Sequence, residues 1–375
     1  MTRESRTPTL PLSDGVELRR PRLSDHVAWR DARLSSQHSI EPHWEASGSS
    51  WAERHSHRSW VRQWLDEQRA TRRGGLRSWA ISVDGVLRGE IRMTGVDRER
   101  GTAELGVWLD GRVAGRGIGK QAVAAVVEHA FDDLGLRTLS APVGVENGAA
   151  RALVVAHGFE RRAVMRRYLR TGSGRPDHEL WVLSAADRVP RGQVATDGRP
   201  PPELRAHRTG GGAMRLRTAV EVARYAVSTA RSAARRGGAE VGEPLPRLSG
   251  PSGPGGTGGA APVVLEPLSA ERWSVVVGGA SVGEVAVQLQ PGTQSAVLTT
   301  GGAAGGELPT PVPAALGEAL GVAAAHLHER LGCERVAVEL SGPTGEETRD
   351  RLREAGLQHE GEPRSGGELW ASVAA

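Results

Sequence analysis

Residues 111–123 read GRVAGRGIGKQAV, a glycine-rich stretch that turns directly into an apolar, helix-forming run. Its alternating glycines are Gly115, Gly117 and Gly119. Such alternation lets successive backbone N–H groups point into one concavity, where the N-terminus of the following helix adds a partial positive charge. Arg116 and Lys120 add full charges, and Lys120 is the only lysine of the sequence. The stretch therefore predicts a loop that holds a pyrophosphate, with a plain tight turn as the alternative.

Two familiar phosphate-binding loops do not fit this stretch. A P-loop requires Gly-Lys-Ser/Thr, whereas here Gln121 follows Lys120. A dinucleotide-binding fold places its glycine loop after the first strand, with an acidic residue about 20 positions further on. Neither pattern matches the order of residues in this chain.

Composition sets the broad class of the protein. A chain of 375 residues exceeds one typical domain, so two globular units are expected. The formal net charge is only +4, which makes nucleic acid an unlikely partner. Cys333 is the one cysteine, which excludes a disulfide framework and fits a reducing compartment. Because no apolar run reaches about 18 residues and no signal-peptide core is present, we expect a soluble, cytoplasmic protein without a membrane segment.

A Pro/Gly/Arg-rich region over 188–262 interrupts the sequence and predicts a linker. Within it, residues 214–236 carry apolar side chains at alternating spacings of four and three beside a line of arginines. This pattern predicts a basic amphipathic helix. The linker separates one predicted domain at 14–187 from a second at 263–375.

Periodicity and turn signals predict the elements of the first domain. Strands are predicted at 16–20, 78–83, 87–95, 102–109, 138–143 and 179–183. Helices are predicted at 24–34 (capped by Ser24), 51–70, 120–134 and 148–157. The order indicates an α+β fold with a central, mostly antiparallel mixed sheet flanked by helices.

The loop and the strand before it resemble the GNAT acetyltransferases. Residues 114–119 align with that family's acyl-CoA pyrophosphate signature, Arg/Gln-x-x-Gly-x-Gly/Ala, except that Ala114 replaces the signature Arg or Gln. Residues 103–109 (AELGVWL) resemble the fourth strand of the branch that acetylates N-terminal α-amines of ribosomal proteins. The resemblance covers about residues 14–187.

Three later motifs extend the resemblance. Asn147 and the segment GFE at 158–160 resemble the family's Asn and its "GF" helix end. Residues 177–181 (DHELW) resemble the closing segment of the same branch. Ala150 departs from the pattern because a Ser is usual at that place.

The resemblance implies a GNAT-like fold and acetyl-CoA as co-substrate. In such folds two neighbouring strands splay, and the pantetheine arm lies between them as an added strand. Here the splayed strands would end near Leu109 and begin near Thr138. The implied cofactor-binding residues are Val107, Leu109, Ala114, Gly115, Arg116, Gly117, Ile118, Gly119, Lys120 and Asn147. For Asn147, an ordinary helix cap is the alternative.

The implied chemistry is direct attack of a primary amine on the thioester, without an acyl-enzyme. Glu104 is the candidate base, because burial in an apolar strand raises a carboxyl pKa. A polar residue on the exposed face of a half-buried strand is the alternative. A backbone N–H near Val107 would stabilise the oxyanion. Tyr168 is a substitute for the general acid, because Val154 stands where many family members have Tyr.

The acceptor pocket is expected in segment 36–64, where such folds build it, with Trp44 and Glu45 as candidate substrate-binding residues. Glu41, Glu45 and Glu53 would attract a cationic acceptor. The histidines of this segment lack a cysteine or a third close ligand, so no metal site is expected. A protein N-terminal α-amine and a small-molecule amine both remain open, as does a homodimer. A non-catalytic CoA-binding regulatory or scaffolding protein is the alternative function.

The second half repeats landmarks of the first. Residues 78–81 match 272–275 and residues 89–91 match 283–285, both at an offset of 194, whereas GFE at 158–160 matches 356–358 at 198. An offset that changes by only four residues along the chain is typical of two copies of one fold, with coincidence as the alternative.

The second copy is predicted to have lost the chemistry of the first. At the offset of the glycine loop stand three prolines, Pro309, Pro311 and Pro313. Proline lacks the N–H groups that a pyrophosphate needs. Val297 falls near the position of Glu104, and Gly345 falls at that of Asn147. Residues 263–375 are therefore predicted to be a degenerate GNAT-like domain without a cofactor loop, supporting or covering the first domain.

Overall fold

The chain forms two compact units. The computed structural model describes residues 7–13, 15–188, 245–249, 262–269, 271–290, 295–302, 312–340, 342, 344–362 and 367–374. The first unit comprises Met1–Arg161, Thr171–Gly174 and Leu180–Arg235, and the second comprises Arg162–Arg170, Arg175–Glu179 and Arg236–Ala375. The helix predicted at 214–236 lies outside the described residues, as does most of the predicted linker.

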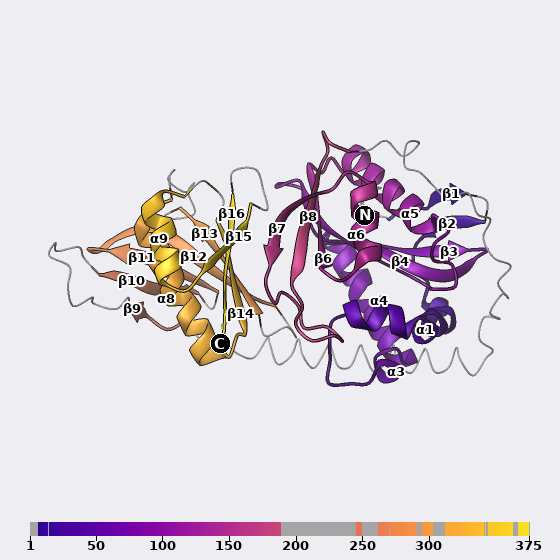
Figure 1. The fold of residues 1–375 in the computed structure, drawn as a ribbon, viewed down its shortest axis with the longest axis horizontal. Coiled ribbons are helices and arrows are strands. Elements are labelled where there is room, and N and C mark those ends of the chain that lie inside the picture. The colour runs from indigo at the N-terminus through magenta and orange to yellow at the C-terminus, as the bar shows by residue number, and fades with distance from the viewer. Residues whose placement is uncertain are drawn as a thin grey trace. The chain divides into compact units, whose positions relative to one another are not determined.

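The first eight strands form a mixed sheet in the order β1-β2-β3-β4-β5-β6-β8-β7 (Figure 1). Their bounds are β1 Leu10–Ser13, β2 Val16–Arg19, β3 Leu76–Val83, β4 Val86–Asp97, β5 Thr102–Leu109, β6 Thr138–Gly144, β7 Glu160–Met165 and β8 His178–Ser184. The pairs from β1 through β5 are antiparallel, and β5 pairs with β6 in parallel. The predicted α+β class with a mostly antiparallel mixed sheet is confirmed.

Helices cover both faces of this sheet (Figure 1). Their bounds are α1 His26–Ser35, α2 Gln37–Ile40, α3 Trp51–Arg54, α4 His57–Arg72, α5 Ile118–Glu128 and α6 Gly148–Ala156. Because side chains alternate along a strand, each face has its own core. Trp79 and Ile91 pack with α5 and α6, whereas Ala80 and Trp108 pack on the opposite face with α1, α3 and α4.

Two of the predicted helices differ from the structure. α1 begins at His26, and the predicted cap, Ser24, lies in a preceding 3-10 turn. The helix predicted at 51–70 is two helices, because Ser56 starts α4 by accepting a hydrogen bond from the Ser59 N–H (3.2 Å). Apolar periodicity does not reveal such a break, since α3 and α4 turn apolar residues toward the same core.

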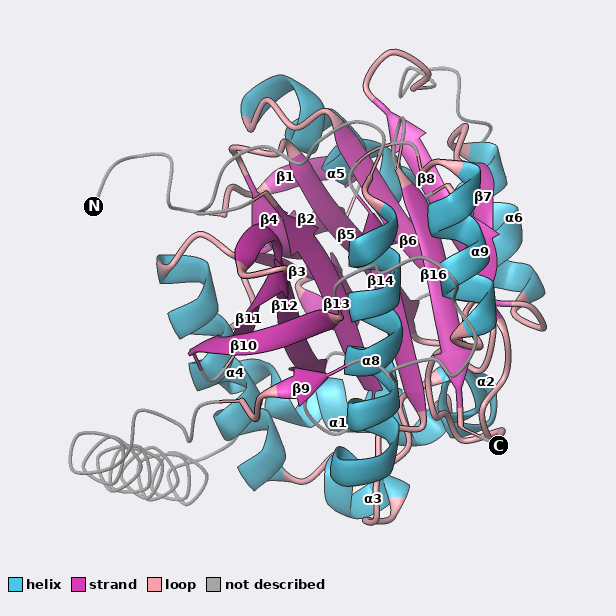
Figure 2. Cartoon of the chain, turned by 90° about the vertical axis from the view of Figure 1, so that its left-hand side faces the viewer, coloured by secondary structure: helices cyan, strands magenta, loops and turns pink. Residues whose placement is uncertain are grey.

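From residue 245 onward, the described residues form strands in the order β9-β10-β11-β12-β13-β14-β16-β15. Their bounds are β9 Leu248–Ser249, β10 Val263–Ser269, β11 Arg272–Val277, β12 Ala280–Gln290, β13 Ser295–Gly301, β14 Arg335–Leu340, β15 Gln358–Gly361 and β16 Glu368–Val373. The helices α8 (Ala314–Leu331) and α9 (Glu346–Glu354) pack against the strands (Figure 2). None of the helices in the described ranges is long and apolar enough to span a bilayer.

The strand order of the second unit repeats that of the first, and so does its register. A register shift follows Ile81 in β3 and Val275 in β11, which are 194 residues apart. Gly89 and Gly283 stand opposite these residues and are separated by the same offset. The sequence repeat therefore coincides with equivalent positions in two sheets of one topology.

Equivalent tryptophans make equivalent contacts in the two units. The Trp79 indole N–H donates to the Pro8 carbonyl oxygen (2.9 Å), and the Trp273 indole N–H donates to that of Pro246 (2.9 Å). Each ring also meets a histidine edge to face: Trp79 meets His129 and Trp273 meets His326. In each unit the same strand thus holds a preceding proline segment and packs on a histidine from a helical segment.

Replacing Gly89 with alanine is expected to destabilise the first unit. An added Cβ would lie 2.6 Å from the Trp108 carbonyl oxygen, which belongs to the paired backbone of β5. We expect a loss of roughly 1–3 kcal/mol in the free energy of unfolding. Gly106→Ala is the control, because nothing lies within 4 Å of its Cβ position. Equal melting temperatures for the two variants, measured by circular dichroism, would contradict this prediction.

Candidate active site

The pairing of β5 with β6 ends before either strand does, and the unpaired stretch between the two strands is called the cleft below. The parallel pairs run from Thr102 opposite Thr138 to Glu104 opposite Ser140. β5 continues to Leu109 and β6 continues to Gly144, so both strands extend beyond the last pair. The two strand ends are therefore not paired with each other beyond Glu104 and Ser140.

Backbone N–H groups of β5 face into this cleft. Thr138 donates its N–H to the Gly101 carbonyl oxygen (3.0 Å), so the carbonyl just before β5 points toward β6. Backbone groups alternate in direction along a strand, and positions an even number of residues from 101 therefore face β6. Val107 and Leu109 are two of these positions beyond the last pair. Their N–H groups can hydrogen-bond an extended ligand that lies between the strands.

The glycine-rich loop follows β5 and leads into α5. Gly115 (φ 72°) and Gly117 (φ 75°) both adopt the left-handed conformation that favours glycine, and Gly117 is the N-cap of α5. The helix begins at Ile118, two residues before the predicted start. The first N–H groups of a helix have no partner within it, so this end of α5 presents donors to an anion.

Asp110 anchors the loop at its first residue. Its buried carboxylate accepts from the Arg112 N–H (3.0 Å) and Nε (2.9 Å), and it pairs with Arg88 (3.3 Å). The Gly111 N–H donates to the hydroxyl of Ser36 (2.9 Å), which in turn bonds Asp110 (3.3 Å). Burial alone would raise the pKa of Asp110, but the bonds and charge of Arg112, with that of Arg88, hold it below its usual range. The loop thus leaves β5 in a fixed direction.

Glu104 lies at the point where the cleft begins. Its side chain shares a face of β5 with Gly106 and Trp108, opposite the core that packs on α5. Solvent reaches the residue, yet surrounding protein desolvates the carboxyl group and raises its pKa to about 7. A carboxylate with this pKa can take up a proton near neutral pH.

Arg33, from α1, forms a stack with two tryptophans on this face. Its guanidinium lies between the rings of Trp44 and Trp108, 3.8 Å from the centroid of each. Burial lowers the pKa of Arg33 to about 9, an effect that the charge of Glu90 opposes, so the group is cationic at neutral pH. Sequence reasoning missed Arg33, because arginines are spread along the whole sequence and no local motif marks this one.

A buried polar network lies behind Trp108. The Trp108 indole N–H donates to Glu90 Oε2 (3.0 Å). Arg92 joins Glu90 (2.9 Å) to Glu67 of α4 (2.8 Å). Burial, together with the charge of Glu90, raises the pKa of Glu67. Glu90 thus binds the indole N–H of Trp108, and Arg33 from α1 packs on its ring.

Trp44 and Glu45 pair with residues 171–172, and these two paired segments are called the strap below. Glu45 forms an antiparallel bridge with Thr171, and the Gly172 N–H donates to the Trp44 carbonyl oxygen (3.2 Å). Burial raises the pKa of Glu45, an effect that the charge of Arg54 opposes. Of the other acidic residues of this segment, Glu53 caps α3 through Ser50 and Glu41 accepts from Gln37 (2.6 Å). Their carboxylates are thus already engaged within the protein.

The two remaining candidate residues, Asn147 and Tyr168, lie outside β5 and the glycine loop. Asn147 is the N-cap of α6, where its Oδ1 accepts from the Ala150 N–H (3.1 Å). It follows β6 and therefore lies at the cleft end of that strand. Tyr168 lies between β7 and β8, among residues that cluster with the second unit, and its ring meets that of His178. Its role as an acid stays a prediction.

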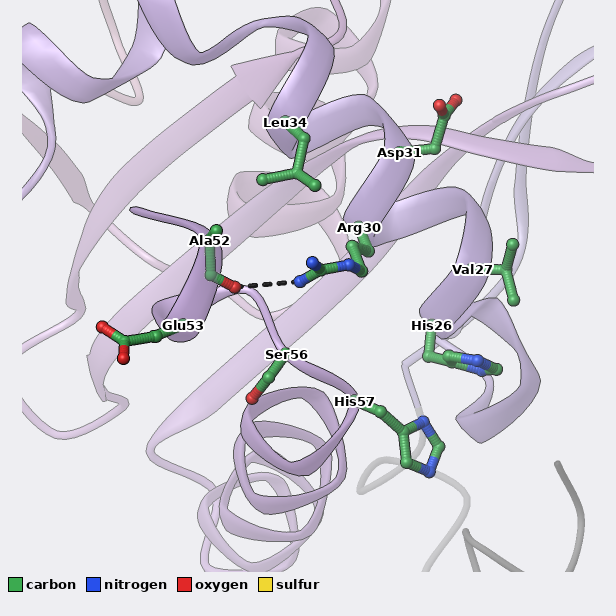
Figure 3. A pocket seen from close by; sticks show the side chains of 9 residues that line it. All are labelled: His26, Val27, Arg30, Asp31, Leu34, Ala52, Glu53, Ser56 and His57. Atoms are coloured by element: carbon green, nitrogen blue, oxygen red, sulfur yellow. Dashed lines mark hydrogen bonds between the residues drawn. The ribbon is translucent and has the colours of Figure 1, made fainter. Parts of the chain in front are cut away.

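A cavity of about 750 Å³ lies along α1 (Figure 3). From α1 it is lined by His26, Arg30 and Leu34, which recur every four residues. Trp29 and Arg33 occupy the buried, sheet-facing side of the same helix. The cavity is thus on the outer side of α1, away from Glu104. In the part of the chain that the structure describes, no three His, Cys, Asp or Glu side chains are grouped to hold a metal ion.

Two buried histidines should make the first unit sensitive to acid. Burial lowers the pKa of His26 and of His55 to about 4, with the charge of His57 adding to the effect at His26. The unfolded chain binds these protons near pH 6.5, so the free energy of unfolding should fall as the pH drops from about 6.5 to 4. His26→Gln should flatten this fall, measured by denaturant titration across the range, and the exposed His43→Gln should not. An unchanged slope in His26→Gln would rule out this role.

Part of the chain matches a known protein family. Residues 16–160 match the family model described as the acetyltransferase (GNAT) domain. The probable N-acetyltransferase YjcK of Bacillus subtilis (strain 168) is 26% identical over 107 residues, which are 28% of this chain and 54% of that protein. The match thus spans about half the length of that curated relative.

Solved structures of ribosomal-protein acetyltransferases are similar to about half of this chain. Mycobacterium smegmatis RimJ, in complex with CoA-disulfide, is 29% identical, with 48% of this chain and 90% of that chain covered and a TM-score of 0.47. The ribosomal-protein-S5-alanine acetyltransferase of Vibrio fischeri is 17% identical, with 49% and 100% covered and a TM-score of 0.44. On the family match, residues 16–160 of this chain belong to the GNAT acetyltransferases, and the chain contains an acyltransferase domain of that family.

Proposed function

We propose that the first domain, residues 14–187, transfers an acetyl group from acetyl-CoA directly to a primary amine. The observation that carries the proposal is the early end of the β5–β6 pairing, with the Val107 and Leu109 N–H groups facing the cleft. An extended pantetheine arm would complete the interrupted ladder, as an added strand does. The co-substrate then supplies an acetyl thioester at the start of the cleft.

The loop and helix after β5 would hold the pyrophosphate of the co-substrate. The left-handed Gly115 and Gly117 turn backbone N–H groups toward the start of α5, where Arg116 and Lys120 add positive charge. Ala114 removes a side chain from the family pattern but no backbone donor. Asn147 lies after β6 and would border the pantetheine from the other strand.

Glu104 would take the proton that the amine must lose. Glu104 would take one proton from the ammonium group; as the freed amine nitrogen bonds to the acetyl carbon, the carbon–sulfur bond breaks, the nitrogen releases its second proton to solvent and the thiolate leaves as CoA. The Val107 N–H would bind the oxyanion, because it faces the cleft three residues beyond Glu104. No residue is assigned to protonate the thiolate, which solvent can protonate as it leaves.

The acidity of Glu104 favours an α-amine as acceptor. An α-ammonium group has a pKa of about 8, so transfer of its proton to a carboxylate with a pKa of about 7 is unfavourable only about tenfold. For a lysine ε-ammonium the same step is unfavourable by more than about a thousandfold. Trp44 and Glu45, held in the strap beside the site, would contact the acceptor. The acceptor class is therefore the N-terminal α-amine of a protein or peptide, or a small amine of similar pKa.

We also propose that the second domain, residues 263–375, is a degenerate copy that holds no acetyl-CoA. In β13, Val297 stands at the register position of Glu104, and Gly345 is the N-cap of α9 as Asn147 is of α6. The strands that correspond to β5 and β6 pair over five residues, from Ser295 to Thr299, two more than in the first unit. The prolines predicted at the loop position, 309 and 311, lie outside the described residues.

Glu104→Gln tests the proposed base. In the wild type, kcat/KM should rise tenfold per pH unit below about pH 7 and level off above it, as Glu104 loses its proton. The variant should lose about 10²-fold or more in kcat with little change in acceptor KM, and this acid limb should vanish. Glu99→Gln, an exposed residue in the β4–β5 turn, is the control. Wild-type kinetics in Glu104→Gln would refute the assignment, and thermal stabilisation by CoA without turnover on any amine would favour a non-catalytic CoA-binding protein.

Calorimetry tests the number of cofactor sites. The chain should bind one equivalent of CoA, and Gly117→Val should abolish binding, because valine is strained at a φ of 75°. Gly301→Val, at the end of β13 in the second unit, should leave binding unchanged. Two equivalents, or binding that survives Gly117→Val, would overturn the assignment of a single site.

A further inference from the structure

The cleft begins at a residue that cannot donate a hydrogen bond. Because Thr138 directs its N–H to the carbonyl oxygen before β5 (3.0 Å), the positions of β6 that face β5 are 138, 140 and 142. Position 142 is a proline, which has no N–H. The next two pairings beyond Glu104 would join 105 to 141 and 106 to 142. Because even-numbered residues of β6 face β5, both pairings require a bond from the N–H of residue 142. The observed pairing ends just before these two pairs.

The second unit shows the same register without this interruption. β13 and β14 pair in parallel from Ser295 opposite Arg335, which are the counterparts of the first paired residues of β5 and β6. Their pairing continues through Leu298 opposite Val338 and Thr299 opposite Glu339. Glu339 stands 197 residues after Pro142, as Arg335 stands 197 after Thr138. The two extra pairs are thus the two that a proline at this position removes.

We infer that Pro142 is the positioning residue that keeps the cofactor cleft open, and that its replacement by Glu339 lets the same cleft close in the second unit. The inference rests on the proposed function, because it assigns the cleft to acetyl-CoA. With an N–H at position 142, the Leu105 carbonyl oxygen would gain a donor and the ladder would extend. The Val107 N–H would then bond the carbonyl oxygen of residue 142. Closure therefore occupies the donor that the cofactor and the oxyanion need.

Pro142→Ala restores the missing N–H and adds no bulk. In ligand-free protein, hydrogen exchange at the Val107 amide should be at least tenfold slower in the variant than in the wild type. The Kd for CoA, measured by calorimetry, should rise at least tenfold, with a matching rise in the KM for acetyl-CoA. The acceptor KM at saturating acetyl-CoA should stay within twofold, because the acceptor side of β5 is not altered.

Two further variants separate this role from general effects of proline. Pro11→Ala makes the same substitution in β1, away from the cleft, and should change neither CoA affinity nor Val107 exchange. Glu339→Pro should speed exchange at the Thr300 amide, the counterpart of Val107, and leave CoA binding unchanged. Unchanged Val107 exchange and unchanged CoA affinity in Pro142→Ala would overturn the inference. A wild-type chain that binds no CoA would refute the proposed function instead, while the exchange measurements would still decide the role of Pro142.

Discussion

The parallel pairing of β5 with β6 ends after Glu104 and Ser140, and the candidate site is arranged around that end point. The last paired residue of β5 carries the carboxylate that would accept the proton. The first free N–H beyond it that faces β6 is that of Val107, and the strand then leads through Asp110 into the glycine loop. One strand would thus supply the proposed base and oxyanion donor and lead into the proposed cofactor loop. Their spacing follows from the rise of about 3.3 Å per residue along a strand.

The electrostatics of the sheet face on the α1 side follow from the same strand. Trp108 places its ring against Arg33 and its indole N–H on Glu90, so a guanidinium and a carboxylate are buried on either side of one residue. Arg92 then connects Glu90 to Glu67 on α4. Such a network orients the groups it joins, because removing any one leaves another buried and unpaired. The position of β5 relative to α1 and α4 is therefore fixed by charge pairing as well as by apolar packing.

Several features of this site could be predicted from sequence because they depend on local chemistry. The bounds of β5 agree with the predicted strand at 102–109, since small or polar and apolar residues alternate from Thr102 to Val107. A helix after the glycine loop was predicted from its apolar run, but its start was placed two residues too late, because Gly119, unlike the left-handed Gly115 and Gly117, lies within α5. The end of the β5–β6 ladder was not predictable in this way, because it depends on the phase of two strands whose paired residues lie 36 positions apart. Likewise β7 (ERRAVM) was missed, because exposed polar side chains hide its alternation.

The two units share the contacts that fill their cores but differ in how far their parallel strands pair. Trp79 and Trp273 keep the same partners because their rings fill equivalent cores, and neither contact depends on a ligand. An open cleft is different, since its backbone N–H and C=O groups forgo the partners that a continued ladder would provide. Water satisfies such groups only in part, and a bound extended ligand satisfies them fully. A unit that gains nothing from ligand binding, as proposed for the second, would have no compensation for unpaired strands, so pairing through Thr299 and Glu339 would be the more stable arrangement there.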